Sequence, residues 1–216
     1  MKITKIERQE TNPKRVNIFC DDQFAYGVHE DVLVRFGLRK GDVVDGKLAA
    51  ELERAEEFNQ AKVAALKFAS HRQRSEKEVR LKLTEKEFAP AVIDEVVAHL
   101  EKHRILDDEA FARAFVNDQL MKKSAGVKLL RQRLRLKGIS KPIIEKVLGE
   151  TLGVETEIAL AREAAAKQLR RLEISSKKLP REKKLKRLAD FLSRRGFTWD
   201  TVSTVIKELF PHSPSN

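Results

Sequence analysis

The stretch RLRLKGISKPIIEKVL, residues 133–148, decides how this chain folds. A basic helical segment runs into Gly138, and a new segment starts at Ser140. Glycine readily takes the left-handed conformation that closes a helix, and serine is a preferred N-cap. The stretch therefore predicts two helices joined by a tight turn.

The same pattern occurs twice more, at residues 82–97 and 191–206. Shifts of 51 and 58 residues align the three copies, and the second shift places Gly138 on Gly196 and Ser140 on Thr198. Helical periodicity alone does not align the glycines, so we interpret the copies as repeats. Glu87 stands at the glycine position of the first copy, and a looser turn is expected there.

A further helix precedes each hairpin. ILDDEAFARAFV (105–116) offers Asp107 as an N-cap, VETEIALAREAA (154–165) aligns with it at a shift of 49, and a long helix is expected around residues 48–70. The sequence thus predicts a mostly α-helical protein with three tandem three-helix repeats in an elongated array. The predicted boundaries are 47–103, 104–152 and 153–210, with a disordered tail at 211–216.

Residues 1–46 differ from the rest. KITKIER (2–8), RVNIFC (15–20) and FAYGV (24–28) have the alternation and residue types of strands, and Asp21–Asp22–Gln23 is a turn signal. A short helix closed by Gly37 follows. We expect a small N-terminal region with a β-hairpin or a three-stranded sheet.

The charge of the chain is unevenly distributed. Its formal net charge is +11. Residues 1–60 contain 10 Lys/Arg and 12 Asp/Glu, a balance of −2, and residues 61–216 contain 34 and 21, a balance of +13. This excess indicates a polyanionic partner, most plausibly nucleic acid or an acidic protein surface. A solvated surface that aids solubility is the alternative.

The helix predicted at 124–137 carries apolar residues on two sides, as expected for a helix wedged between neighbours. Its third side gathers Lys128, Arg131 and Arg135. Asp and Glu are absent from 119–144, so nearby helical acids are not expected to neutralise all three cations. This side is the leading candidate contact surface.

Arginines of the first repeat are further candidates for binding. Arg72 and Arg74 lie in the joint HRQRS between two helices, and Arg80 lies in the helix that follows. Solvated surface arginines are the alternative interpretation.

The sequence contains no pattern typical of catalysis. Asp107 and the two acids after it fit a helix N-terminus, and His99 and His103 have helical spacing but lack a third ligand. Cys20 lies in a predicted strand. We therefore expect no catalytic residue, cofactor or metal site. With neither a secretory signal nor a membrane-length apolar run, we expect a soluble cytoplasmic protein.

Three motifs in order resemble the RecX family, the bacterial regulators of the RecA recombinase. They are ALKFASHRQRSEKEVRLKL (65–83), ILDDEAFARAFV (105–116) and LRLKGIS (134–140), and GLRKGD (37–42) is similar to part of an N-terminal extension in longer members. The sequence departs from the family pattern at Val79, where leucine is usual, and at Glu87.

The resemblance implies tandem three-helix repeats without enzymatic activity. It also implies a monomer that binds the RecA–DNA nucleoprotein filament and modulates, usually downward, the ATPase and strand exchange of RecA. Weaker contacts with single- and double-stranded DNA are a further implication. A basic helical-repeat protein that affects recombination only by competing for DNA is the alternative.

Overall fold

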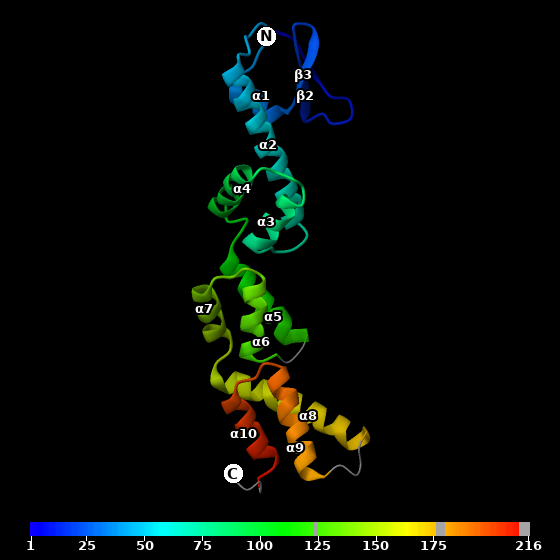
Figure 1. Ribbon diagram of the computed structural model, residues 1–216, viewed down its shortest axis with the longest axis vertical. Helices are drawn as coiled ribbons and strands as arrows, with labels where there is room; N and C mark the ends of the chain where they lie inside the picture. Colours follow the sequence, from blue (N-terminus) through cyan, green and yellow to red (C-terminus); the bar gives the residue numbers. More distant parts are fainter. Residues whose placement is uncertain (123–124, 176–179, 212–216) are drawn as a thin grey trace. The chain divides into compact units, whose positions relative to one another are not determined.

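The computed structural model describes residues 1–122, 125–175 and 180–211. The chain begins with an antiparallel sheet in the order β1 (Ile3–Arg8), β2 (Arg15–Cys20) and β3 (Gln23–His29) (Figure 1). Asp21 and Asp22 form the β2–β3 turn with φ values of 49° and 64°, the paired positive angles of a two-residue hairpin loop. The expected N-terminal sheet is confirmed.

Two helices cover this sheet. Helix α1 (Glu30–Phe36) ends at Gly37, whose φ is 62°, and α2 (Gly46–Ala69) begins after Asp45, whose Oδ1 accepts the Leu48 amide at 2.8 Å. Leu52 and Ala55 of α2 share one buried cluster with apolar residues of all three strands. The marginal sheet is thus stabilised by the first half of α2.

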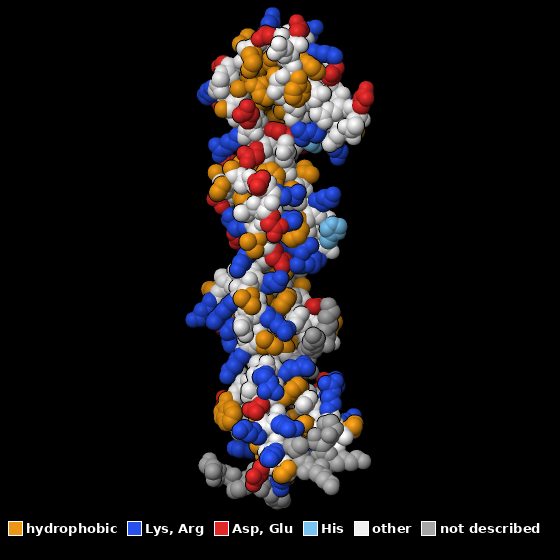
Figure 2. All heavy atoms as spheres, turned by 45° about the vertical axis from the view of Figure 1, so that its right-hand side comes forward, with side chains coloured by type: hydrophobic (Ala, Val, Ile, Leu, Met, Phe, Trp, Pro, Cys, Tyr) orange, Lys and Arg blue, Asp and Glu red, His pale blue; other side chains and the backbone are white. Residues whose placement is uncertain are grey.

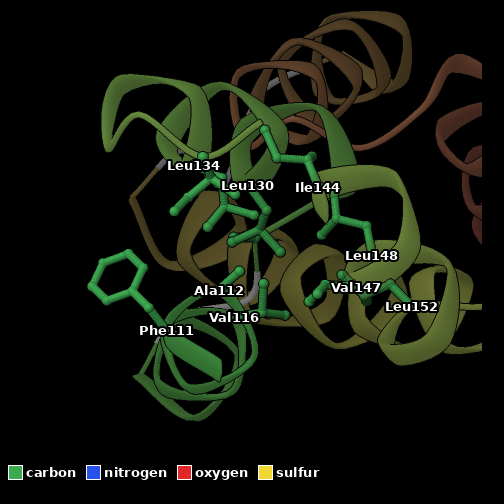
Figure 3. Packing of buried hydrophobic residues seen from close by; sticks show 11 residues of the cluster. Phe111, Ala112, Val116, Leu130, Leu134, Ile144, Val147, Leu148 and Leu152 are labelled. Carbon is green, nitrogen blue, oxygen red and sulfur yellow. The ribbon is translucent and has the colours of Figure 1, made fainter. Parts of the chain in front are cut away.

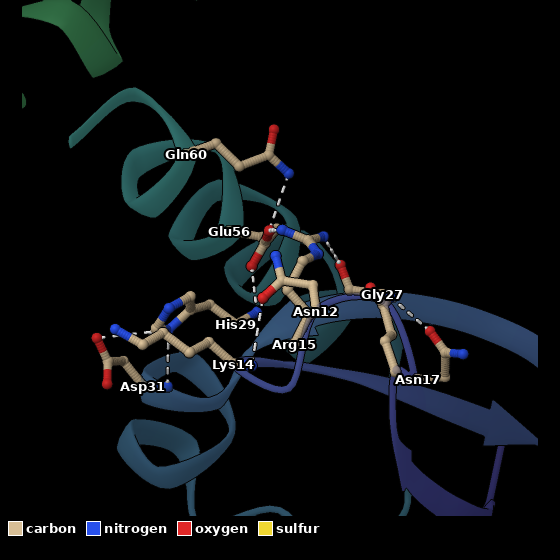
Figure 4. A network of polar contacts seen from close by, with 10 residues as sticks. Asn12, Lys14, Arg15, Asn17, Gly27, His29, Asp31, Glu56 and Gln60 are labelled. Atoms are coloured by element: carbon tan, nitrogen blue, oxygen red, sulfur yellow. Dashed lines mark hydrogen bonds and ion pairs between the residues drawn. The ribbon is translucent and has the colours of Figure 1, made fainter. Parts of the chain in front are cut away.

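A buried carboxylate also links α2 to the sheet. Glu56 is 8% exposed and accepts hydrogen bonds from Arg15 Nη1 at 2.6 Å, the His29 amide at 2.7 Å and Gln60 Nε2 at 2.8 Å (Figure 4). The Arg15 Nη2 group also donates to the Gly27 carbonyl at 2.6 Å. Since the charge is paired and its oxygens are hydrogen-bonded, its burial is compensated.

The remaining helices form the predicted repeats. Their bounds are α3 (Glu76–Thr84) and α4 (Pro90–Lys102) after α2, then α5 (Asp108–Lys122), α6 (Val127–Leu136) and α7 (Lys141–Thr151), then α8 (Val154–Ser175), α9 (Arg181–Arg194) and α10 (Trp199–Leu209). The mostly α-helical fold class is confirmed. The predicted tail lies, from residue 212, outside the described residues.

Equivalent positions build each repeat core. In the second repeat, Leu130 of α6 points toward Ala112 and Val116 of α5, and Val147 of α7 completes the contact (Figure 3). The buried equivalents in the other repeats are Val79, Ala61, Ala65 and Val96, and Leu188, Ala161, Ala165 and Val205. The aligned apolar positions therefore face a core in all three copies.

The three hairpin turns have one geometry. Gly138 and Gly196 have φ values of 88° and 82°, as the C′ role predicts. Glu87 takes the same conformation with φ 63°. The amides of Phe88, Ile139 and Phe197 each bind the carbonyl five residues earlier, at 3.1 to 3.3 Å. The expectation of a looser first turn is wrong, because Glu87 is held in a left-handed conformation instead.

The N-cap predictions have a mixed outcome. Thr198 accepts the Thr201 amide, whereas Ser140 occupies the N-cap position of α7 without a capping hydrogen bond. Pro142 follows at the second helical position, where it removes one of the amides that a cap would bind.

The chain divides into two compact units. The first contains the sheet, α1, α2, α4 and most of α3, and the second contains α5 to α10 together with the segment Arg74–Lys77. Each unit has its own buried clusters.

The turn geometry predicts opposite effects for two exchanges. Glu87→Gly should raise the free energy of unfolding by about 0.5–1 kcal/mol, because it relieves a left-handed non-glycine residue. Gly138→Ala should lower it by about 1 kcal/mol or more, because φ is positive and a Cβ would stand 2.5 Å from Lys77 Cβ. Urea unfolding followed by circular dichroism measures both changes. Equal destabilisation by the two exchanges would contradict the shared turn.

Candidate interaction surface

Within the second unit, the start of α6 rests directly on the turn before α10. The Gly126 amide donates to the Arg195 carbonyl and the Lys128 amide to the Gly196 carbonyl, both at 2.9 Å. A Cβ on Gly126 would lie 2.2 Å from the Phe197 nitrogen. Position 126 therefore admits only glycine at this joint.

A buried carboxylate completes the joint. Glu157 of α8 is 5% exposed, and its Oε1 accepts both the Val127 amide and the Thr198 amide at 3.2 Å. Its Oε2 accepts the hydroxyl of Thr201 at 3.0 Å. Because one oxygen receives both amides, the starts of α6 and α10 lie close together at this joint.

The segment Arg74–Lys77 repeats this arrangement elsewhere in the second unit. Ser75 Oγ donates to the Lys137 carbonyl at 2.8 Å, and the Glu76 amide donates to Asp108 Oδ1 at 2.9 Å. In the repeat alignment, Ser75 corresponds to Gly126 and Asp108 to Glu157. The joint thus occurs twice in the unit. The Ser75 hydroxyl donates the hydrogen bond to the preceding turn in one copy, and the Gly126 amide donates it in the other.

The acids at the start of α5 have structural roles. Asp107 Oδ1 accepts the Ala110 amide at 2.8 Å, which confirms the predicted N-cap. Burial raises the pKa of Asp108, although the hydrogen bond from the Glu76 amide opposes this effect. Sequence reasoning assigned Asp108 only to the first helical turn and missed its contact with Glu76.

Lys128, Arg131 and Arg135 all lie on α6, as the sequence predicts, but they differ in their ion-pair partners. Lys128 and Arg135 are exposed, and neither forms an ion pair within the part of the chain that the structure describes. Arg131 forms a bidentate pair with Glu145 of α7, with Nε–Oε1 and Nη2–Oε2 distances of 2.8 Å. Asp and Glu are absent from residues 119–144, and Glu145 is the first acid that follows. Glu145 neutralises Arg131, whereas Lys128 and Arg135 have no ion-pair partner among the described residues.

The Arg131–Glu145 pair shifts both pKa values. The hydrogen bond from Arg131 is the main cause that lowers the pKa of Glu145, and the charges of Arg135 and Lys141 lower it further. The same bond raises the pKa of Arg131. The two side chains remain 29% and 43% exposed, so water screens much of their attraction.

Arg80 is engaged in the same way in the first repeat. Its Nη1 lies 2.5 Å from Asp94 Oδ1, and both residues precede Arg131 and Glu145 by 51 positions. The third repeat has Ala189 and Ser203 at these places. The shared 14-residue spacing is a sequence signal that could have identified Glu145 as the partner of Arg131.

The two arginines of the joint after α2 also differ. Arg72 is exposed and makes a bidentate pair with Glu78, at 3.0 and 3.1 Å. Arg74 is half-buried and belongs to the second unit. Of all the predicted binding residues, Lys128 and Arg135 thus present the most exposed charge without a carboxylate partner among the described residues.

Further exposed cations extend this charge within the second unit. Lys141, Lys186 and Arg187 are exposed and form no ion pair among the described residues. Figure 2 shows Lys and Arg side chains outnumbering acidic ones on the visible face of the second and third repeats. We call Lys128, Arg135 and Lys141 the basic face of the second repeat.

The histidine pair packs as a structural element. The rings of His99 and His103 lie 4.2 Å apart, and His99 meets Phe58 edge-on. Burial is the main cause that lowers the pKa of His99, followed by the charge of His103. In the residues that the structure describes, no group of three or more His, Cys, Asp or Glu could hold a metal ion. None of the helices there is long and apolar enough to cross a membrane.

The lowered pKa of Glu145 predicts how its contribution to stability depends on pH. An acid with a lowered folded-state pKa stabilises the fold above its ordinary pKa of 4.5, and this contribution disappears as the pH falls through the lowered value. Glu145→Gln should therefore cost about 0.5 kcal/mol or less at neutral pH and nothing in strong acid. Urea unfolding of the parent, of Glu145→Gln, of Arg131→Gln and of the double variant measures the interaction energy of the pair. A cost that stays constant down to strong acid would rule out the ion pair as its source.

Comparison with known proteins covers almost the whole chain. Family models match residues 1–45 as the RecX N-terminal domain, and residues 61–100, 107–148 and 155–206 as the first, second and third three-helix domains of RecX. The chain is 28% identical to a protein whose crystal structure is described as regulatory protein RecX. That alignment has a TM-score of 0.82 and covers 94% of this chain and 98% of the other.

Curated relatives agree with these matches. The chain is 38% identical over 208 residues to regulatory protein RecX of Bacillus subtilis, covering 96% of this chain and 76% of the relative. It is 31% identical to regulatory protein RecX of Clostridium acetobutylicum, covering 96% of both. From its N-terminal sheet through its three helical repeats, this chain belongs to the RecX family of regulatory proteins.

Proposed function

We propose that this chain is a non-enzymatic modulator of RecA, mainly an inhibitor. It binds the RecA–DNA nucleoprotein filament as a cytoplasmic monomer and reduces the ATPase, recombinase and strand-exchange activities of RecA. Membership of a regulatory family along nearly the whole chain supports this function. The observation that carries the binding mode is the basic face of the second repeat, whose cations have no carboxylate partner among the described residues.

A nucleoprotein filament carries negative charges that are complementary to the cations of this face. Phosphates and acidic side chains both attract lysine and arginine, and the attraction is strongest where no carboxylate of the same chain competes. Lys128 and Arg135 meet this condition better than Arg72, Arg80 or Arg131, which already bind Glu78, Asp94 and Glu145. We therefore rank Lys128 and Arg135 first among the residues proposed to bind.

A direct test measures RecA ATPase on single-stranded DNA with and without this protein. Inhibition at protein concentrations well below those that coat the DNA supports the proposal. An unchanged ATPase rate, with binding to the filament confirmed separately, contradicts an inhibitory role.

Competition for DNA is the second candidate function, and the unpaired cations also favour it. Nuclease treatment before a pulldown with RecA separates the two. Retained RecA indicates a regulator that contacts the protein filament, and lost RecA indicates a DNA-binding protein.

Charge reversal on the basic face should weaken binding. Lys128→Glu with Arg135→Glu should reduce affinity for the RecA–DNA filament by about tenfold, because each exchange turns attraction into repulsion. The fold should persist, since exposed exchanges usually change stability by about 0.5 kcal/mol or less. Anisotropy of labelled DNA in the filament measures the affinity.

The matched control is Lys40→Glu with Lys47→Glu, an equal change of charge at two exposed sites of the first unit. The control should bind like the parent. If both pairs weaken binding equally, net charge acts and the basic face does not. Loss of DNA phosphate contacts should also flatten the salt dependence, by about 0.9 in log–log slope per contact on duplex DNA.

Removing the carboxylate of Glu145 should have the opposite effect on binding. Glu145→Gln releases Arg131 and adds a positive charge to the same face, so affinity for the filament should rise. The same anisotropy measurement tests this gain. Weaker binding by Glu145→Gln would show that the pair positions Arg131 for contact.

A further inference from the structure

Trp199 is a large apolar side chain on the surface of the third repeat. It is the sole tryptophan of the chain, it begins α10, and it is 68% exposed. The core of this repeat is formed by other residues of α8, α9 and α10, such as Leu188, Phe197 and Val205. Among the residues that the structure describes, Trp199 is not part of the apolar cluster that forms this core.

The repeat alignment shows that the fold does not require an aromatic residue at this position. Shifts of 58 and 51 residues place Trp199 on Lys141 and Pro90. Both are exposed and begin the equivalent helices α7 and α4. The indole is therefore a feature of the surface of the third repeat.

The joint described above brings the start of α6, which carries cations, close to the start of α10, which carries the indole. Glu157 Oε1 accepts hydrogen bonds from the amides of both Val127 and Thr198, and Lys128 and Trp199 are the residues that follow these two in the sequence. Lys128 is exposed and forms no ion pair among the described residues. Arg131 lies one helical turn further along α6, and its charge interacts with Glu157. Asp200, in the first turn of α10, is the acid next to the indole in sequence.

An exposed indole and an exposed lysine at the starts of two adjoining helices suit a nucleic acid with unpaired bases. Such bases stack on aromatic side chains while cations hold the backbone phosphates, and stacking tolerates any sequence. Paired bases in a duplex hide their faces. We propose that Trp199 is a stacking platform for a base of single-stranded DNA, with Lys128 binding an adjacent phosphate.

This inference rests on the proposed function and deepens it, because it specifies how the chain contacts DNA, and its main test measures DNA binding without RecA. Since Trp199 is the sole tryptophan, its fluorescence reports on this site alone. Titration of the full chain with a short oligothymidylate should quench the emission in a saturable, salt-dependent manner. A duplex of equal length should quench it much less.

Three variants separate stacking from charge. Trp199→Ala should lower affinity for labelled oligothymidylate by about tenfold, and Trp199→Phe should retain most of it. Lys128→Glu should weaken binding and flatten its salt dependence, because one phosphate contact is lost. Unfolding midpoints equal to that of the parent verify that the variants fold, as the exposure of both side chains implies.

Absence of quenching, or equal affinity of the parent and Trp199→Ala, overturns the proposal. Quenching by RecA protein without DNA, and none by oligothymidylate, also overturns it and makes Trp199 a protein contact. If Trp199→Ala loses oligothymidylate binding, the stacking site stands whether or not the chain inhibits RecA ATPase. The outcome for this site is thereby distinguishable from that for the proposed function.

Discussion

The approach of Gly126 to the peptide between Gly196 and Phe197 is the contact on which the second unit depends. Backbone meets backbone there at hydrogen-bond distance, without an intervening side chain. Such closeness needs glycine on one side and a left-handed turn on the other, and it brings together the amides of Val127 and Thr198. Glu157 satisfies both, because a buried amide without a partner would cost the unit stability.

The joint has consequences for the surface. Glu157 and the backbone hydrogen bonds hold the first turn of α6 against the turn before α10, and Lys128 in this first turn is exposed. The following turns carry Arg131, which turns back to Glu145, and Arg135, which stays exposed. The joint therefore positions the helix that carries these cations, and the acid on α7 determines which of them is neutralised.

Local signals in the sequence predicted the elements well and their partners poorly. The positive φ at Gly138 and Gly196 follows from residue type and spacing alone, and so does the cap by Asp107. The prediction of a looser turn at Glu87 is wrong because the backbone hydrogen bonds of the turn hold this non-glycine residue in the left-handed conformation. The roles of Asp108 and Glu157 depend on amides about 30 residues away, which no local pattern shows. The pairing of Glu145 with Arg131 is not evident from acids close in sequence, because the two residues belong to different helices. The equal spacing of Arg80 and Asp94 is the signal that indicates it.

The repeats share their cores and differ on the surfaces of their second helices. Helix α3 mixes acids with bases, α6 contains bases without any acid, and α9 again carries more bases than acids. The pair of Arg80 with Asp94 and that of Arg131 with Glu145 have no counterpart at Ala189 and Ser203. Pairs between the first and third helices behave differently, since Arg113–Glu150 recurs as Arg162–Glu208. This ion pair is thus kept in the second and third repeats, whereas the first repeat has Lys62 and His99 at the equivalent positions. Because these positions are outside the core, their charge can change without altering the packing that aligns the repeats.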